Sequence, residues 1–271
     1  MSNVLNLILI IVISILSLLY LPQMLYMILG LFLKPKRYKE AKVNHKYAIV
    51  ICAHDEEKVI GKLIDSINNQ DYPRDKFETF VILDNCVDKT KEICESKNVI
   101  AIENTSLSHG KGYALDFGFS HILSNPEYDD IEAFIIFDAD NILTSNYITE
   151  MNKCFDSGIK CATSFRNAKN YKTNYISATS EIFFLRESAL VHKVRSLLKI
   201  GTFVSGTGFY VARDIVIDNN GWKFFTMTED IEFSINEALK DRKIGFCYDA
   251  EFYDEQPVDV KTLFNQRLRW C

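Results

Sequence analysis

Residues 133–141 read Ala-Phe-Ile-Ile-Phe-Asp-Ala-Asp-Asn, five apolar residues followed by two acidic residues spaced two apart. A short apolar run that ends in polar residues is typical of a β-strand buried on both faces. Similar runs occur at Tyr47–Ala53 and Thr79–Leu83, and each of these is followed by a helical pattern. This alternation predicts an α/β fold with a doubly wound, mostly parallel sheet.

Acidic clusters follow all three predicted strands, at residues 54–57, 84–88 and 138–140. The carboxyl ends of parallel strands meet at one edge of a sheet, and ligands bind there in folds of this class. Carboxylates gathered at one place repel each other unless a cation or a donor-rich ligand is present. The sequence therefore predicts a ligand site at this edge.

Asp138 and Asp140 are candidate metal ligands. Residues two apart in an extended chain point to the same side, so both carboxylates can face one ion. Hard cations such as Mg²⁺ or Mn²⁺ bind one or two carboxylates and complete their shell with phosphate oxygens and water. A diphosphate ester held in this way has its leaving-group charge neutralised. The alternative is a simple turn cap, and the buried strand before Asp138 favours the metal site.

Four other side chains each have a functional and a structural interpretation. Asp84 is either a nucleobase or ribose ligand or the start of an Asx-turn. Glu56 is either a ribose ligand or an acid favoured by a helix N-terminus. Lys111, flanked by glycines, either binds phosphate or is solvated. Asp230 opens a helical pattern, and it is either an ordinary first-turn acid or a general base for an attacking hydroxyl.

The last residues of the chain form an amphipathic helical pattern that can lie along a membrane surface. Its apolar positions are Val260, Leu263, Phe264 and Leu268. In the functional interpretation, Arg269 contacts phosphate and Trp270 is a platform for a sugar ring. The alternative is a terminal surface helix with a buried Trp.

The N-terminus has the composition of a membrane span. Residues 1–33 contain no charged side chain, so all 31 basic and 36 acidic residues lie beyond Leu33. The apolar run exceeds the about 20 residues that cross a bilayer. No basic residue precedes it and no small-residue cleavage site follows, which argues against a signal peptide. The basic residues of the linker 34–46 predict that the rest of the chain lies in the cytoplasm, at the cell membrane.

Composition limits the remaining possibilities. The net charge of −5 gives no electrostatic footprint for nucleic acid, so we expect no such partner. Seven cysteines without a Cys-x-x-Cys pair argue against a disulfide framework and a structural zinc site, and indicate reduced thiols. Residues 47–271 show no second-domain linker and predict one domain, in which residues 166–221 have no clear pattern.

Six motifs occur in a recognisable order: Ile51-Cys52-Ala53-His54-Asp55-Glu56-Glu57, Asp84-Asn85-Cys86-Val87-Asp88, Lys111-Gly112, Asp138-Ala139-Asp140, Thr228-Glu229-Asp230 and Gln266-Arg267-Leu268-Arg269-Trp270. Together they resemble family 2 glycosyltransferases with a GT-A fold, especially the membrane-bound cellulose, chitin and hyaluronan synthase branch. The resemblance extends from about Tyr47 to the C-terminus. It implies an inverting transfer from a nucleotide-diphosphate sugar, most often a UDP-sugar, to a saccharide or lipid-linked acceptor.

The resemblance also implies a role for each motif. The implied donor-binding residues are Ala53, Glu56, Asp84, Lys111 and Asp138. The implied ligands of Mg²⁺ or Mn²⁺ are Asp138 and Asp140, and Asp230 is the implied base. The residues implied at the diphosphate and acceptor end are Gln266, Arg269 and Trp270.

Some features depart from the family pattern. Cys52 stands where the family often has Pro, and Asp55 where it often has Asn. Processive members continue into further transmembrane helices, whereas this sequence stops one residue after Trp270, so we expect either a fragment or a protein without a channel of its own. Two rival functions are a sugar-nucleotide nucleotidyltransferase, which needs a basic, glycine-rich loop where residues 54–57 are acidic, and a catalytically incomplete, membrane-tethered scaffold.

Overall fold

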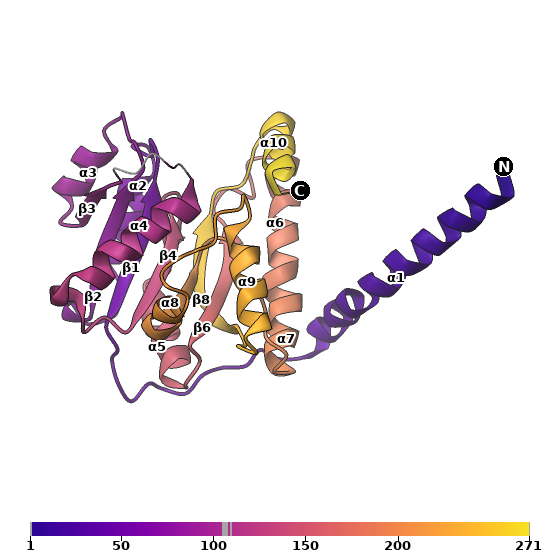
Figure 1. Ribbon diagram of the computed structural model, residues 1–271, viewed down its shortest axis with the longest axis horizontal. Helices are drawn as coiled ribbons and strands as arrows, with labels where there is room; N and C mark the ends of the chain where they lie inside the picture. Colours follow the sequence, from indigo (N-terminus) through magenta and orange to yellow (C-terminus); the bar gives the residue numbers. More distant parts are fainter. Residues whose placement is uncertain (1, 105–107, 109, 271) are drawn as a thin grey trace.

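The computed structural model describes residues 2–104, 108 and 110–270. A long helix, α1 (Ser2–Phe32), projects from an α/β domain (Figure 1). Within the described part of the chain, its segment Val4–Phe32, with a mean hydropathy of 2.8, is the one helix long and apolar enough to cross a membrane. The helix predicted over residues 1–33 is therefore present, and its insertion in a membrane stays a prediction.

One eight-stranded sheet organises the domain, with the strand order β3-β2-β1-β4-β7-β6-β8-β5. The strands are β1 (Tyr47–Ala53), β2 (Phe77–Leu83), β3 (Ile100–Glu103), β4 (Ala133–Asp138), β5 (Ile142–Leu143), β6 (Cys161–Ala168), β7 (Phe209–Ala212) and β8 (Gly245–Asp254). The half formed by β3, β2, β1 and β4 is parallel. Strand β7 pairs antiparallel with both β4 and β6, so the sheet is mixed. The predicted doubly wound α/β fold is confirmed.

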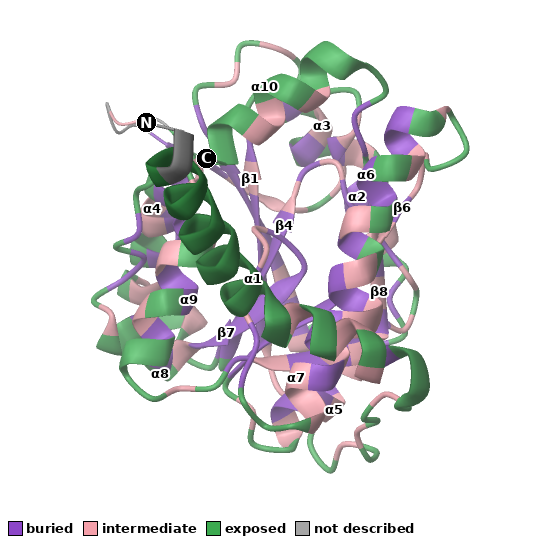
Figure 2. Ribbon diagram, turned by 90° about the vertical axis from the view of Figure 1, so that its right-hand side faces the viewer, coloured by how far each residue is buried: buried purple, intermediate pink, exposed green. Residues whose placement is uncertain are grey.

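Helices cover the sheet. They are α2 (Ile60–Asn68), α3 (Thr90–Ser96), α4 (Lys111–Ser124), α5 (Tyr147–Asp156), α6 (Tyr175–Arg186), α7 (Lys193–Leu197), α8 (Arg213–Asp218), α9 (Glu229–Leu239) and α10 (Val260–Trp270). A π-helical turn, Glu187–His192, joins α6 to α7. Purple, buried residues run along the strands in Figure 2, while the helices turn green faces outward.

The apolar runs form strands because they are buried on both faces of the sheet. Ile49, Val50, Ile135 and Ile136 are fully buried. Burying a side chain of this size contributes about 1.5–3 kcal/mol. The register pairs Cys52 of β1 with Asp138 of β4, so these two strands end side by side. The acidic residues that follow the strands are therefore brought together, as predicted.

Gly208 is required where β7 begins. Its backbone has φ +65°, and a Cβ at this position would overlap the ring of Phe252. We expect Gly208→Ala to destabilise the fold by about 3 kcal/mol, because it combines backbone strain with overpacking. Urea unfolding measures this change. Gly61→Ala is the control, because its Cβ would meet the flexible end of Lys97 at 3.3 Å and Ile93 Cγ2 at an ordinary contact distance of 3.5 Å, and we expect a change within about 1 kcal/mol.

Candidate active site

Two adjoining cavities open at the carboxyl ends of β1, β2 and β4. The donor-side cavity, of about 720 Å³, has among its lining residues Ala53, Glu56, Asp84, Lys111, Asp138, Asp140 and Arg269. The acceptor-side cavity, of about 580 Å³, shares Lys111, Asp138, Asp140 and Arg269 and adds Asp230, Gln266 and Trp270. All ten side chains singled out from the sequence thus line one continuous cleft. Their individual roles stay predictions.

A third cavity, of about 630 Å³, lies elsewhere and is lined by residues that include Lys160, Asp214 and Arg242. It contains none of the ten predicted positions. Lys160 and Asp214 pair with each other at 3.1 Å, on the outside of the domain. The chemistry predicted from the sequence is therefore concentrated in the two-part cleft at the strand ends.

The carboxylate of Asp84 is held at the far end of the donor-side cavity. Its oxygens accept hydrogen bonds from Asn104 Nδ2 at 3.1 Å and from the backbone N–H of Gly110 at 3.3 Å. Its own N–H donates to the carbonyl of Ala53 at 2.8 Å, which continues the ladder between β1 and β2. Glu56 lines the same cavity, and its pKa is raised mainly by burial and then by the negative charge of the nearby Asp138. This end of the cleft therefore presents hydrogen-bond acceptors to a ligand.

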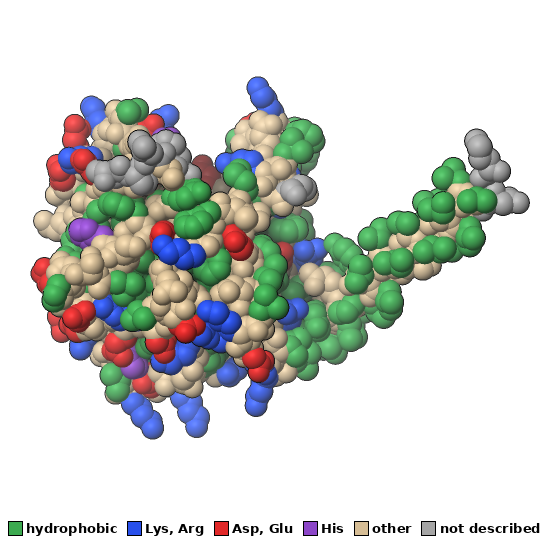
Figure 3. All heavy atoms as spheres, viewed as in Figure 1, with side chains coloured by type: hydrophobic (Ala, Val, Ile, Leu, Met, Phe, Trp, Pro, Cys, Tyr) green, Lys and Arg blue, Asp and Glu red, His purple; other side chains and the backbone are tan. Residues whose placement is uncertain are grey.

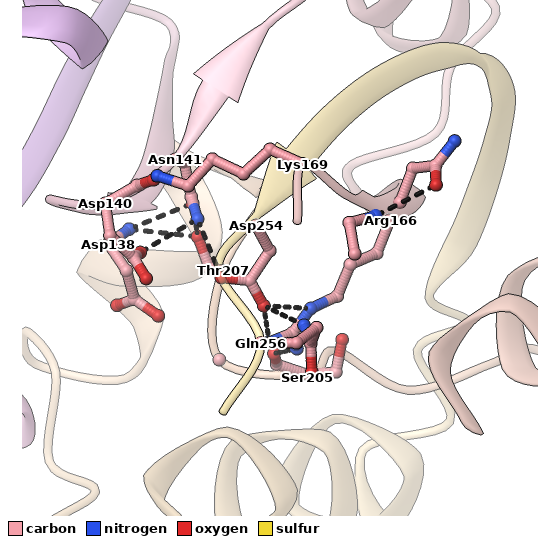
Figure 4. A network of polar contacts seen from close by, with 12 residues as sticks. Asp138, Asp140, Asn141, Arg166, Lys169, Ser205, Thr207, Asp254 and Gln256 are labelled. Atoms are coloured by element: carbon pink, nitrogen blue, oxygen red, sulfur yellow. Dashed lines mark hydrogen bonds and ion pairs between the residues drawn. The ribbon is translucent and has the colours of Figure 1, made fainter. Parts of the chain in front are cut away.

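A polar network holds the turn that contains Asp138 and Asp140 (Figure 4). The backbone N–H of Asp138 donates to Thr207 Oγ1 at 2.9 Å, and Thr207 in turn donates to Asn141. Asn141 Nδ2 donates to Asp140 Oδ1 at 3.2 Å and reaches Asp254 Oδ1 at 3.5 Å. The two candidate metal ligands are thus tied to β8 through the amide side chain of Asn141.

The carboxylate of Asp254 is held in place by the largely buried guanidinium of Arg166. Arg166 Nε donates to Asp254 Oδ2 at 2.8 Å, and Gln256 Nε2 donates to the same oxygen at 3.0 Å. The guanidinium carbon of Arg166 also lies 3.7 Å from the ring centre of Phe184. Pairing and hydrogen bonding of this kind offset the cost of burying both charges.

Asp140 is the carboxyl most affected by its surroundings. Burial, together with the charges of Asp254 and Asp138, raises the pKa of Asp140 to about 8, against the opposing charges of Lys169 and Arg166. Neighbouring carboxylates that crowd in this way are favourable for a divalent cation, which removes the repulsion.

The donor set fits a cation shared with a substrate. Among residues 2–104, 108 and 110–270, no three His, Cys, Asp or Glu side chains form a metal cage. Asp138 and Asp140 supply two carboxylates, and Mg²⁺ or Mn²⁺ commonly takes its remaining ligands from substrate phosphates and water. The site therefore suits a metal that binds together with a diphosphate.

Lys111 lies where the two cavities meet. Its Nζ donates to the carboxylate of Asp138 and to the carbonyl of Gly206, the latter at 2.7 Å. Burial lowers the pKa of Lys111, but Asp138 and Glu229 more than offset it, so the pKa is raised and the side chain stays cationic. A fixed cation beside the candidate metal ligands favours an anionic ligand such as a diphosphate.

Asp230 enters the cleft from the first turn of α9. Its Oδ1 accepts a hydrogen bond from the N–H of Ile231 at 2.8 Å. A Cβ added at Gly206 would lie 3.5 Å from Asp230 Oδ2 and 3.9 Å from Lys111 Nζ, so Gly206 keeps the space between these two groups open. Burial raises the pKa of Asp230 above its ordinary value. A carboxylate with a raised pKa is a stronger base.

Helix α10 closes the acceptor side. Trp270 contacts the ring of Phe184 edge-on at 6.1 Å, and Arg267 stacks 4.5 Å from the Trp270 ring. Trp270 keeps 38% of its surface exposed, so it is packed on one side and open on the other. The buried Gln266 Oε1 has no hydrogen-bond partner in the described part of the chain, which leaves an acceptor for a ligand hydroxyl.

Sequence reasoning missed Arg166 and Asp254 as parts of the site, and it gave no role to the side chains of Asn141 and Thr207. Asn141 directly follows the Asp138-Ala139-Asp140 motif, and that position was the available signal. Arg166 and Asp254 lie 88 residues apart and meet only in the folded sheet, through the parallel pairing of β6 and β8.

Fold and site together define a glycosyltransferase domain of the GT-A type. The chain belongs to the family described as glycosyltransferase like family 2, whose model matches residues 45–271. It is 24% identical over 236 residues to a β-monoglucosyldiacylglycerol synthase of Synechocystis sp., covering 82% of this chain and 46% of that protein. It is 26% identical to the probable glycosyltransferase YdaM of Bacillus subtilis, covering 88% and 57%. The chain spans about half the length of these relatives.

Solved structures share the fold. The mannosyltransferase PcManGT from Pyrobaculum calidifontis, in complex with GDP-Man and Mn²⁺, matches with a TM-score of 0.69 at 17% identity, covering 95% of this chain and 71% of that one. S. aureus TarS in complex with UDP-GlcNAc matches with a TM-score of 0.54 at 16% identity, covering 79% and 59%. These matches support the GT-A fold. The narrower resemblance to cellulose, chitin and hyaluronan synthases stays a prediction.

Proposed function

We propose that this chain is the catalytic part of a membrane-anchored, inverting glycosyltransferase that takes its sugar from a UDP-sugar. The observation that carries the proposal is the meeting of two cavities at Asp138 and Asp140, with Asp230 on the acceptor side only. A donor bound across Asp138 and Asp140 leaves its sugar facing Asp230. The solved relatives with GDP-Man and UDP-GlcNAc support a nucleotide-diphosphate sugar as donor.

The arrangement suits a single displacement at the anomeric carbon. Asp230 accepts the proton of the acceptor hydroxyl, whose oxygen forms the new bond to the anomeric carbon. The bond from that carbon to the diphosphate oxygen breaks, and Lys111 stabilises the charge of the departing diphosphate. A divalent cation, when bound at Asp138 and Asp140, neutralises further charge on the leaving group. Because attack and departure occur on opposite faces, the configuration inverts.

We propose a lipid hydroxyl as the acceptor rather than a soluble saccharide. The acceptor-side cavity has apolar side chains on its wall, among them Phe183, Phe184, Phe203, Phe225, Met227 and Ile231. Such a wall binds the apolar part of an amphiphile and leaves its head group near the charged residues. The Synechocystis relative, a β-monoglucosyldiacylglycerol synthase, supports the same class.

The test combines donor binding with product analysis. In lipid nanodiscs, the chain is titrated with UDP and Mn²⁺ by calorimetry and then supplied with UDP-sugars and membrane lipids. We expect UDP binding that requires Mn²⁺ or Mg²⁺, and a product whose anomeric configuration, measured by NMR, is opposite to that of the donor. Absence of UDP binding would favour the scaffold alternative, and retained configuration would contradict the proposed displacement.

A further inference from the structure

Helix α1 has two parts that differ in their surroundings. Every residue from Val4 to Pro22 is exposed. At about 1.5 Å per residue this stretch is about 28 Å long, close to the roughly 30 Å of a bilayer core. Beyond Pro22, positions 23, 26, 27, 29 and 30 are half-buried or buried, and this spacing marks one face of a helix. The end of α1 thus packs on protein, while the earlier part is free to contact lipid.

The packed end of α1 contacts the π-helical turn and α7. Gly30 is buried against Leu190, and a Cβ at position 30 would lie only 2.8 Å from the Leu190 Cα. Lys193 Nζ donates a hydrogen bond to the carbonyl of Gly30 at 2.7 Å. The guanidinium of Arg195 lies 5.8 Å from the ring centre of Tyr26. Glycine at position 30 therefore permits a close approach that a side chain as large as Leu would block.

Hydrogen bonds hold the segment after α1 against the domain. The Tyr38 hydroxyl donates to the carbonyl of Phe246 at 3.2 Å, and the N–H of Lys42 donates to Asp156 at 2.9 Å. The ring of His45 lies between Glu132 and Asp156, at 2.8 and 3.2 Å. The segment predicted as a linker over residues 34–46 is thus bound to the domain along its length.

The surface that contacts the end of α1, formed by the π-helical turn and α7, is continuous with the acceptor-side cavity. The π-helical turn begins with Glu187, which lines the acceptor-side cavity, and continues to Leu190, which contacts Gly30. Ser188, between them, accepts a hydrogen bond from the N–H of Arg166 at 3.2 Å. The π-helical turn therefore contacts α1 at one end and lines the acceptor-side cavity at the other.

Several exposed side chains on the side of the domain nearest α1 are apolar. Figures 1 and 2 show α6, α9 and α10 on the side from which α1 projects. Exposed apolar residues on these helices include Ile182, Ile235, Leu239 and Phe264. Figure 3 shows apolar side chains along this edge of the domain and over α1. Apolar side chains beside a spanning helix favour contact with the bilayer surface.

We infer that residues 23–33 are a docking segment rather than part of the membrane span, and that they hold the acceptor-side cavity against the cytosolic surface of the bilayer. The docking itself does not depend on the proposed function. Its consequence, the delivery of a membrane lipid to Asp230, rests on that function. Disrupting the contact between residues 23–33 and the π-helical turn is then expected to impair transfer to bilayer lipids, while donor binding is kept.

A disulfide tests the docking without any measurement of activity. A Cβ at position 30 would lie 3.0 Å from the Leu190 Cβ and 2.8 Å from the Leu190 Cα, so a cysteine there requires the two helices to separate by about 1 Å, which brings the two Cβ atoms to the about 3.5–4.5 Å of a disulfide. In nanodiscs under mild oxidation, Gly30→Cys with Leu190→Cys is expected to cross-link in most molecules. Ser17→Cys with Leu190→Cys is the control and is expected to stay open, because Ser17 lies in the exposed stretch. An equally low yield from both pairs would overturn the docking.

Activity then tests the consequence of docking. We expect Gly30→Leu to lower transfer to bilayer lipids about tenfold, because displacement of a bound partner by about 1 Å impairs catalysis strongly. UDP affinity should not change. Ser17→Leu adds similar bulk in the exposed stretch and should transfer at the wild-type rate. Wild-type transfer by Gly30→Leu would show that docking does not position the cleft, whereas loss of UDP binding by the parent protein would instead count against the proposed function.

Discussion

Asp230→Asn is expected to lower kcat for glycosyl transfer by about 10²- to 10⁴-fold, the usual contribution of a general base. Asn has the same shape and keeps a carbonyl oxygen for the N–H of Ile231, but it cannot accept the proton of the acceptor hydroxyl. Because Asp230 lines only the acceptor-side cavity, the affinity for UDP and Mn²⁺ is expected to stay within a factor of about two. Steady-state kinetics with a saturating donor, together with UDP titration, separates the two effects.

Glu232→Gln is the matched control for this substitution. Glu232 also lies in the first turn of α9 and is also half-buried, but it accepts hydrogen bonds from Thr226 instead of facing the cleft. Both substitutions remove one negative charge near the N-terminus of the same helix. Similar rates for the two variants would remove Asp230 from the role of base, since they would show that only the general charge at this helix end matters.

The sequence predicts best the half of the fold that is buried on both faces. The strand predicted at Tyr47–Ala53 has those bounds in the structure, and the strand predicted at Thr79–Leu83 begins two residues earlier, at Phe77. In a parallel sheet covered by helices, each strand position must be apolar, so the pattern is unambiguous. The same reasoning located the strand ends and therefore the cleft that they border.

Residues 166–221 escaped prediction in part because helix α6 has apolar side chains on both its buried and its exposed faces. Its inward face mixes the apolar Ile176 and Phe184 with the polar Ser177, Ser180 and Glu181, while Ile182 and Leu185 are exposed. Apolar periodicity normally marks the buried face of a helix, and here it is blurred because apolar residues lie on both faces. The exposed apolar positions fit the proposed contact of this side of the domain with the bilayer surface, which local sequence does not reveal.

The predicted role of Asp138 and Asp140 leads to a pH dependence of metal binding. Burial and the neighbouring carboxylates raise the pKa of Asp140 to about 8, so below this pH the carboxyl holds a proton that a cation must displace. Metal binding to a protonated ligand releases that proton. The affinity of the protein for Mn²⁺ in the presence of UDP is therefore expected to fall about tenfold for each pH unit below 8, and to level off above it.

Asp140→Asn separates this effect from general changes with pH. The variant is expected to bind Mn²⁺ at least about 100-fold more weakly at pH 8, since even partners of metal ligands contribute 10- to 100-fold. Its residual binding should lose the pH slope, because the titrating group is gone. Asp75→Asn removes an exposed carboxylate from the turn before β2 and should keep both affinity and slope. Electron paramagnetic resonance of free Mn²⁺ between pH 6 and 8 measures all three proteins. A slope that persists in Asp140→Asn would assign the titration to another group, and wild-type affinity in that variant would remove Asp140 from the metal site.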